Sequence, residues 1–407
     1  MSIPLLDLNR QYDTIKEEIR DAIDEVLESQ YFIMGDNVEQ FEDEVGTYCE
    51  TEHTYGCASG SDALLLALMA MDVNPGDYVI TTPFTFFATA GAISRLKAIP
   101  VFLDIEKDSY NLDPKQVELF LKKEHPVYKK LDPDPERIKA VIPVHLYGQM
   151  ADMDPIMKIA SEHGLKVIED AAQAIGATYK GQKAGSMGDF GCFSFFPSKN
   201  LGAYGDAGLI TVKDPILAEK TDILRLHGAK PKYHHSIVGI NSRLDSIQAA
   251  ILSVKLRYLD EWSEKRKEIA HTYNELFRKA GIVGDLNECK DVCSENCGLD
   301  PNSIITPTET TGASDQSGRH IYHQYTIRTK KRDALAKVLN AENIGHSVYY
   351  PVPLHEQECF SYLGYKASDC PNAHCASRQV ISLPIYPELK EAEIQKVADT
   401  VISVHTS

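Results

Sequence analysis

The N-terminal part of the chain carries apolar residues at helical spacing. Between residues 12 and 30 they fall three or four positions apart, which predicts an amphipathic helix. A turn at 31–35 interrupts this pattern, and the spacing then resumes as a second helix that continues to Cys49. A third helix is predicted for 60–71, where an apolar run follows the polar cluster Ser59-Gly60-Ser61-Asp62.

Short runs of apolar and β-branched residues then alternate with helical stretches. Such alternation is typical of a mostly parallel sheet with helices on both faces. Ligands of these sheets bind beyond the carboxyl ends of the strands, which is where Asp170 and the Ser59–Asp62 cluster fall. The predicted strands are 78–82, 100–104, 140–145, 166–169 and 190–196, and the predicted helices between them are 88–95, 114–122 and 155–163.

A long charged segment, residues 242–277, predicts one helix that leads into a second domain. We therefore expect a large domain over 1–250 and a smaller α+β domain over 251–407. Residues 285–318 have little periodicity and are rich in Cys, Gly, Ser, Thr and Asn, which predicts a long loop or insertion. The elements predicted beyond it are a strand at 322–328, a helix at 332–342 and a strand at 346–350.

The composition of the 407-residue chain is typical of a globular protein, with 43% hydrophobic and 25% charged residues. Asp and Glu outnumber Lys and Arg by 59 to 42, which gives a formal net charge of −17. A field of this sign repels nucleic-acid backbones and anionic membranes, so we expect neither as a partner. The hydropathy pattern leads us to expect neither a signal peptide nor a membrane-spanning helix.

Nine cysteines are scattered along the chain, and this odd number favours reduced thiols and a cytoplasmic location. Cys289, Cys293 and Cys297 recur every four residues within the predicted insertion. They lack the two-residue pairing and the fourth ligand of a typical zinc site, so free thiols are favoured over a metal site. We predict no metal.

Lys199 lies in the run Ser194-Phe195-Phe196-Pro197-Ser198-Lys199-Asn200-Leu201-Gly202, which continues an apolar strand. A lysine on a loop is most often a solvated charge. Here the aromatic and proline residues before it, and the glycine-rich residues 202–208 after it, indicate a tightly folded backbone around the amine. A desolvated lysine has a lowered pKa and can act as a nucleophile toward an aldehyde.

Asp170 follows the predicted strand 166–169 and precedes Ala171-Ala172-Gln173. A carboxylate at the start of a helix is common, because the helix dipole favours it there. Together with Lys199, the Asp170 carboxylate indicates a more specific function, the binding of a cofactor. The amine would hold the aldehyde of pyridoxal phosphate, and the carboxylate would keep the ring nitrogen protonated. Gln173, three residues further on, would reach a ring oxygen. The pair predicts a pyridoxal phosphate enzyme.

A phosphate site is predicted where Gly60 and Ser61 open their helix, because free backbone amides at a helix start bind anions. Ser and Gly are also ordinary helix caps, so this signal alone is weak. Ser194 would add a hydroxyl to the same phosphate. Phe86, in the run 83–89, would stack on a planar ring, and a core position fits it nearly as well.

The stretch 225–235 gathers Arg, Lys and His in an otherwise acidic chain. Through His227 and Lys230 it suits a substrate that carries a diphosphate. It fits a solvated basic loop equally well, and charge patterning alone does not separate the two interpretations.

These motifs together resemble the DegT/DnrJ/EryC1/StrS family of nucleotide-sugar aminotransferases. The resemblance covers nearly the whole chain, except for 288–318, where we find no counterpart. It implies the fold type I architecture of pyridoxal phosphate-dependent transferases, a homodimer with the active site at its interface, and a role in polysaccharide biosynthesis. The matching segments are 3–8, 59–66, 83–89, 143–149, 169–176, 194–208, 239–252, 349–355 and 383–387.

Carried over to this sequence, the resemblance makes Lys199 the catalytic lysine that bonds to the cofactor and Asp170 the partner of its ring nitrogen. It implies that Gln173 contacts the ring oxygen and that Phe86 stacks on the ring. The phosphate would be bound by Gly60, Ser61 and Ser194, and Asn241 would reach the phosphate of the neighbouring subunit. The residues implied near the nucleotide sugar are Arg243, Tyr322 and Gln324.

Lys199 is intact, whereas dehydratases of the same family carry histidine there, so the resemblance implies transamination. Residues 239–245 and 349–355 are more similar to members that aminate a 3-keto sugar. The 4-keto group more often has an aromatic residue at the position of Ser242. The predicted substrate is therefore a UDP-linked 2-acetamido-2-deoxy-3-oxo-glucuronate, with glutamate as amino donor, and Arg243 would pair with the sugar carboxylate.

Two alternatives stay open. The same chemistry on a dTDP-linked 3-keto-6-deoxyhexose, or on a 4-keto sugar, would leave Arg243 without a carboxylate partner. A non-catalytic regulator that binds the cofactor as a sensor would not need a nucleotide-sugar pocket. The intact Lys199, the basic stretch 225–235 and the net charge of −17 all weigh against that second alternative.

Overall fold

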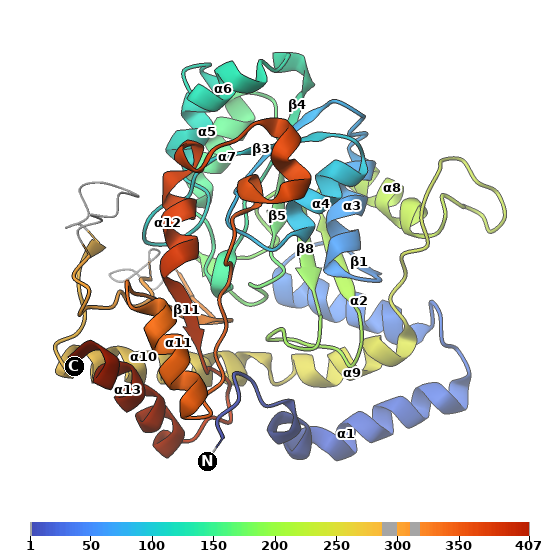
Figure 1. Cartoon of the computed structure of the whole chain (residues 1–407). Coiled ribbons are helices and arrows are strands. Elements are labelled where there is room, and N and C mark those ends of the chain that lie inside the picture. Colours follow the sequence, from blue (N-terminus) through green and yellow to red (C-terminus); the bar gives the residue numbers. More distant parts are fainter. Residues whose placement is uncertain (1, 287–298, 310–317, 407) are drawn as a thin grey trace.

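A seven-stranded sheet forms the centre of the computed structural model, which describes residues 2–286, 299–309 and 318–406 (Figure 1). The strand order is β1-β9-β8-β5-β4-β2-β3. β9 runs antiparallel to both of its neighbours, and the other adjacent pairs are parallel. The strands are β1 (His53–Cys57), β2 (Tyr78–Thr81), β3 (Ile99–Phe102), β4 (Ile138–Ile142), β5 (Lys166–Asp170), β8 (Phe190–Ser194) and β9 (Gly208–Val212).

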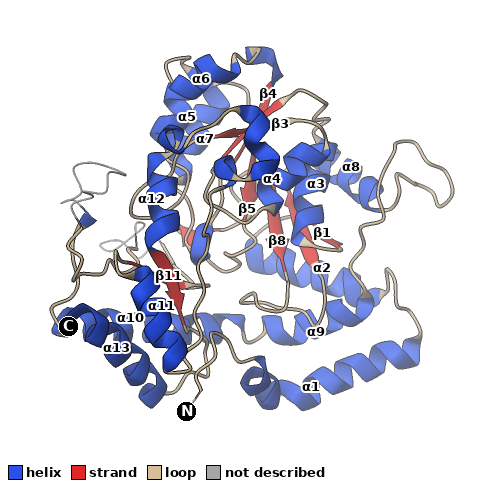
Figure 2. Cartoon of the chain, in the orientation of Figure 1, coloured by secondary structure: helices blue, strands red, loops and turns tan. Residues whose placement is uncertain are grey.

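Helices cover both faces of this sheet (Figure 2). Successive strand residues therefore enter two different cores, as Val79 and Ile80 do in β2 and Val167 and Ile168 do in β5. Burial on both sides explains why these strands are apolar throughout. One face is covered by α2 (Asp36–Cys49), α5 (Pro114–Leu121), α6 (Pro126–Leu131), α7 (Met153–Glu162) and α9 (Ser246–Leu256), and the other by α3 (Gly60–Ala70), α4 (Ala88–Arg95) and α8 (Pro215–Arg225).

A further hydrophobic cluster combines residues from both ends of the chain. The fully buried Ile3 joins it, so the first residues lie among C-terminal elements. The predicted boundary at residue 250 falls inside α9, and the division into two domains stays a prediction. The elements of this cluster are α10 (Leu259–Lys279), α11 (Arg332–Ala341), α13 (Glu391–Thr406) and the antiparallel pair β10 (Tyr325–Arg328) and β11 (Val380–Leu383).

Three smaller parts complete the described chain. Helix α1 (Leu8–Ser29) packs on α9 through Ile15 and Ile19. The hairpin of β6 (Thr178–Tyr179) and β7 (Gln182–Lys183) follows β5, and α12 (Pro371–Gln379) precedes β11. No helix within residues 2–286, 299–309 and 318–406 is long and apolar enough to cross a membrane.

The predicted α/β fold with a mostly parallel sheet is confirmed. The single helix predicted over 242–277 is wrong, because α9 ends at Leu256 and α10 begins at Leu259. The break lets the two helices join different cores. Leu252 packs against the central sheet, whereas Phe277 packs in the cluster that contains Ile3.

Two other predictions also need correction. Residues 346–350 form no strand, because only Ser347 pairs, in a single bridge to Ser382, and the next residues line a cavity. The predicted loop 285–318 contributes to the core where it is described, since the fully buried Ile304 pairs with Val283. The cysteines at 289, 293 and 297 lie outside the described residues.

Candidate active site

A cavity of about 720 Å³ opens at the carboxyl ends of the parallel strands. β5 ends at Asp170, β8 ends at Ser194, and α3 begins near them at Gly60. Parallel strands present their carboxyl ends at one edge of a sheet, and ligands of such folds bind there. A cavity of this size is typical of a small-molecule site. The predicted site residues that line it are Gly60, Ser61, Phe86, Asp170, Gln173, Ser194, Lys199 and Gln324.

Lys199 reaches the cavity from a tight loop after β8. Its amide donates to the carbonyl of Phe196 at 2.8 Å. A Cβ on Gly202 would lie 2.4 Å from the carbonyl oxygen of Pro197, so only glycine fits at that point. The buried amine of Lys255 on α9 donates to the Gly202 carbonyl and holds the loop against that helix.

The amine of Lys199 and the carboxylate of Asp170 form an electrostatic pair. Burial lowers the pKa of Lys199 to about 8, against the opposing effect of the Asp170 carboxylate. Burial raises the pKa of Asp170, and hydrogen bonds to the charged form oppose that rise. Thr89 Oγ1 donates to Asp170 Oδ2 at 2.7 Å, and the Ala172 amide donates to Oδ1 at 3.2 Å. The cavity thus holds a reactive amine and an oriented carboxylate.

Gln173 is held by two tyrosines. Its Oε1 accepts from the Tyr147 amide at 2.8 Å, and its Nε2 donates to Tyr350 Oη at 3.1 Å. A side-chain amide has two N–H donors, so one of them stays available for a ligand. The predicted contact with a ring oxygen is compatible with this arrangement and stays a prediction.

The start of α3 has the features of an anion site. Ser59 caps the helix, because its Oγ accepts from the Asp62 amide at 3.2 Å. The amides of Gly60 and Ser61 find no acceptor in the described part of the chain, as is usual for the first residues of a helix. A Cβ on Gly60 would lie 2.6 Å from that of Ser194, so glycine lets the end of β8 approach these free amides.

Phe86 lies at the mouth of the cavity. It leaves 58% of its surface exposed, and its ring centre is 6.4 Å from that of Tyr350. An aromatic ring exposed beside a cavity can stack on a planar ligand.

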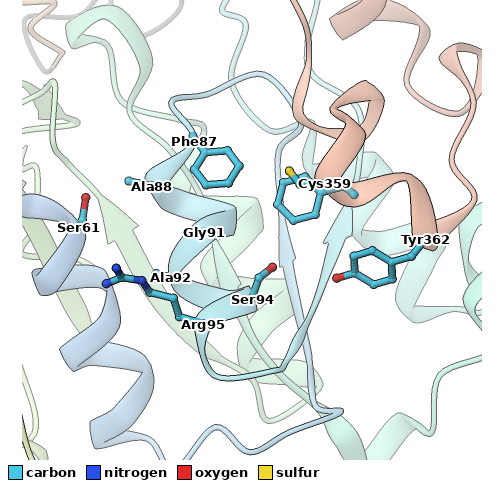
Figure 3. Close-up of a pocket in the computed structure, with 10 residues that line it drawn as sticks. Ser61, Phe87, Ala88, Gly91, Ala92, Ser94, Arg95, Cys359 and Tyr362 are labelled. Carbon is cyan, nitrogen blue, oxygen red and sulfur yellow. The ribbon is translucent and has the colours of Figure 1, made fainter.

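A second groove, of about 450 Å³, adjoins the cavity and shares Ser61, Phe87 and Ala88 with it. Figure 3 shows Arg95 on the side of Ser61 and Tyr362 on the opposite side of the groove. The groove therefore extends the open space beside the cavity along α4.

Tyr322 does not line the cavity, although the resemblance implies that it lies near the substrate. It is buried in the cluster that contains Ile3, where its ring stacks on His320 with 3.9 Å between ring centres. Its hydroxyl donates to Glu309 at 2.7 Å. The segment instead reaches the cavity through the two residues that follow Tyr322, His323 and Gln324.

Four further predicted site residues also lie outside the cavity of their own chain. His227 and Asn241 are exposed, and Lys230 pairs with Glu219 at 3.1 Å. Arg243 has a buried Nε with no hydrogen-bond partner among the residues that the structure describes. The single chain does not bring these side chains to the cavity, and their roles at a neighbouring subunit stay predictions.

Thr89, His323 and Tyr350 belong to the site but were not among the predicted residues. His323 Nδ1 lies 3.0 Å from Asn200 Oδ1, which ties the Lys199 loop to the segment before β10. Burial, together with the Lys199 amine, lowers the pKa of His323, so its imidazole is neutral. In the sequence, the position of His323 next to the predicted Gln324 could have indicated that His323 belongs to the site.

The lysine loop after β8, the carboxylate at the end of β5 and the order of the sheet define a fold type I pyridoxal phosphate-dependent transferase. A solved structure supports this class. The aminotransferase from Brucella abortus superposes with a TM-score of 0.87 at 33% identity, and the match covers all of both chains.

The chain belongs to the DegT/DnrJ/EryC1/StrS aminotransferase family, whose sequence model matches residues 13–295 and 298–402. It is 49% identical to a pleiotropic regulatory protein of Geobacillus stearothermophilus, over 98% of both chains. It is 40% identical to the UDP-N-acetyl-3-dehydro-α-D-glucosamine 3-aminotransferase of Acidithiobacillus ferrooxidans (98% of this chain, 97% of that one). It is 37% identical to the UDP-2-acetamido-2-deoxy-3-oxo-D-glucuronate aminotransferase of Pseudomonas aeruginosa (97% and 98%). The predicted family and the predicted class of enzyme are confirmed.

Proposed function

We propose that this chain is a pyridoxal phosphate-dependent aminotransferase that transfers an amino group from glutamate to the ketone of a nucleotide-linked 3-keto sugar. One observation carries the proposal. The amine of Lys199, with its pKa lowered to about 8, lines the same cavity as the hydrogen-bonded carboxylate of Asp170. An amine that is partly neutral at physiological pH and a buried carboxylate are the two groups that this cofactor requires.

The remaining cavity residues fit the cofactor. The free amides of Gly60 and Ser61 suit its phosphate, and the exposed ring of Phe86 suits stacking on its ring. Asp170 would hold a proton on the ring nitrogen. When bound, the cofactor supplies an aldehyde that takes up the amino group and a ring that withdraws electrons from the reacting carbon.

Lys199 has two tasks in this proposal. Its neutral amine would hold the cofactor through the aldehyde, with loss of water, and so fix the position of the cofactor. The same amine, once free, would move a proton from the carbon of the amino donor to the cofactor. A pKa near 8 suits both tasks, because the amine then exchanges protons readily at neutral pH.

The sugar is proposed to be UDP-linked and to carry a 2-acetamido and a 3-oxo group. Relatives at 40% and 37% identity are named for such sugars, and one of the two is a glucuronate. Arg243 favours the sugar acid, because its buried Nε–H has no acceptor within the described residues and a carboxylate would supply one.

The active unit is proposed to be a homodimer. Several large apolar side chains are exposed near the start of α9, where Ile33 pairs with Asp245 and the Tyr204 amide donates to Gln248. Clustered exposed apolar residues mark interaction surfaces. A second copy would cover these residues and would bring residues 241–243 to the cavity of its partner. The exposed residues are Tyr31, Phe32, Ile33 and Tyr204.

The test runs the sugar half of the reaction in reverse. Protein loaded with pyridoxal phosphate is mixed with UDP- and dTDP-linked 3-amino and 4-amino sugars, and the yellow absorbance of the loaded protein is followed. We expect a UDP-linked 3-amino sugar acid to bleach it, with Lys199→Ala as the inactive control. Bleaching only by 4-amino or uncharged 6-deoxy sugars would keep the class of enzyme and overturn the proposed substrate.

A regulator is the second candidate function. It is favoured by one observation, the 49% identity to a relative named a pleiotropic regulatory protein. Such a protein would bind pyridoxal phosphate through Lys199 yet transfer no amino group with any nucleotide sugar. A loaded protein that none of the sugars bleaches would therefore favour the regulator over the enzyme.

A further inference from the structure

Tyr350 places a hydroxyl in the cavity that none of the proposed roles uses. Its ring packs edge-on against Phe84, with 6.2 Å between centres and an angle of 78° between planes, and lies 6.4 Å from the ring of Phe86. These contacts fix the ring, so the hydroxyl has a defined position beside Gln173.

Gln173 decides the direction of the hydrogen bond between them. The oxygen and nitrogen of a side-chain amide are nearly alike in shape, so their partners determine which is which. The Tyr147 amide, 2.8 Å away, can only donate, and it must therefore face Oε1. The other end of the side chain is then the NH₂ group, which can only donate, so Tyr350 Oη at 3.1 Å is the acceptor.

The proton of the Tyr350 hydroxyl is consequently left for another partner. Among the residues described by the structure, no atom accepts it. Burial raises the pKa of Tyr350, and the nearby Asp170 carboxylate raises it further, so the hydroxyl keeps its proton at any physiological pH. The hydroxyl lines the cavity, so an oxygen atom of a bound ligand can accept this proton.

We propose that Tyr350 donates this hydrogen bond to an oxygen atom of the molecule bound in the cavity, and that Gln173 positions the hydroxyl for it. Gln173 Nε2 has a second N–H, so the two side chains offer two donors 3.1 Å apart, which selects for an oxygen acceptor. The inference rests on the proposed function, because the acceptor is either the ring oxygen of the cofactor or an oxygen of the sugar.

Tyr350→Phe removes the hydroxyl and keeps the ring against Phe84. Three quantities are measured: the dissociation constant of pyridoxal phosphate, the absorbance–pH titration of the bound cofactor, and the dissociation constant of the UDP-linked 3-amino sugar acid. A cofactor acceptor predicts a shifted titration and about tenfold weaker cofactor binding. A sugar acceptor predicts an unchanged cofactor and about tenfold weaker sugar binding. If both dissociation constants stay within about twofold of wild type and the titration is not shifted, the proposal is wrong.

Tyr365→Phe is the matched control, because it also removes the hydroxyl of a partly buried tyrosine, one that accepts from the Phe102 amide outside the cavity. Tyr365→Phe should leave both dissociation constants and the titration unchanged.

Positioning by Gln173 is tested with Gln173→Leu. Adding Tyr350→Phe to Gln173→Leu should cost less binding than the same change costs in wild type. Equal costs in the two backgrounds would refute positioning by Gln173. If wild type binds none of the sugars, the proposed function fails, but the cofactor titration still tests Tyr350.

Discussion

The amine of Lys199 lines the cavity, where the surrounding residues reduce its contact with water and lower its pKa to about 8. At pH 7 about one amine in ten is then neutral, compared with about one in three thousand for an ordinary lysine. We expect the rate at which cofactor-free protein bonds pyridoxal phosphate to rise with pH up to about 8 and to level off above it. Stopped-flow absorbance measures this rate. A rise that continues toward pH 10.5, the ordinary pKa, would show a solvated amine.

The Asp170 carboxylate raises the pKa of Lys199, so the loss of its charge should have two opposite effects. In Asp170→Asn, the midpoint of the bonding rate should move below its wild-type pH, and bonding at pH 7 should become faster. Turnover should nevertheless fall about 100-fold or more, because the ring nitrogen of the cofactor would lose its proposed charged partner. Thr89→Val keeps the charge and should leave the midpoint unchanged. A parallel decrease in bonding and turnover would contradict this account.

Lys199 and Asp170 could be predicted because their signals are local: a strand that ends in a polar residue and a lysine between aromatic and glycine residues. Thr89 and Tyr350 could not be predicted. Thr89 meets Asp170 across 81 positions of sequence, and Tyr350 meets Gln173 across 177. Such contacts exist only after the helices and loops have packed around the sheet.

Among the secondary-structure elements, α2, α8 and β1 are joined by a buried ion pair. The Arg225 guanidinium donates to Glu42 and to the Gly56 carbonyl, and Glu42 accepts from the Gly56 amide at 2.7 Å. Without the Glu42 charge, the buried guanidinium would keep only the partly exposed Asp222 carboxylate, 2.8 Å away, as its charge partner. Glu42→Gln should therefore lower the free energy of unfolding in urea by about 2 kcal/mol.

The control for this prediction is an ion pair of the same kind on the surface. Glu118 and Lys122 lie one helical turn apart on an exposed face of the chain, with 2.6 Å between Lys122 Nζ and Glu118 Oε1. Glu118→Gln should leave the urea midpoint unchanged, because solvent screens exposed pairs. Equal losses in the two variants would show that burial does not determine the strength of the pair at Glu42.

The helices and parallel strands could mostly be predicted, because burial on one side gives the helices a periodic sequence and burial on both faces makes the parallel strands apolar runs. β9 could not. Its first residue, Gly208, belongs to a glycine-rich run that predicts a turn, but a Cβ there would lie 2.3 Å from the carbonyl carbon of Ser59. This glycine serves the close approach of a strand to the start of α3. The break between α9 and α10 was also missed, because no Gly or Pro marks it and both halves keep helical spacing.

At the scale of the whole molecule, the chain carries candidate site residues that its own cavity does not use. Asn241 and Arg243 lie outside the cavity, and exposed aromatic residues gather near the start of α9. A twofold-symmetric dimer uses the same surface on both subunits, so each subunit can complete the cavity of the other. This arrangement would explain why a buried Arg243 Nε lacks a partner in the described single chain.

Mixing two inactive variants tests this arrangement. Lys199→Ala and Arg243→Ala should each abolish amination of the sugar as homodimers. If Arg243 acts in the cavity of its partner, a mixed dimer has both changes in one site and neither in the other. Random reassociation of equal amounts makes about half of the dimers mixed, so about a quarter of the wild-type activity should return.

The same mixture also tests the simpler arrangement, in which Arg243 acts in the cavity of its own chain. If Arg243 acted in the cavity of its own chain, each site of a mixed dimer would keep one harmful change and no activity would return. Mixing Lys199→Ala with Asp170→Asn provides the matched control, because both side chains line the cavity of one chain and no mixed site is intact. Recovery in the first mixture but not in the second, with subunit exchange verified by native mass spectrometry, would place Arg243 in the partner's active site.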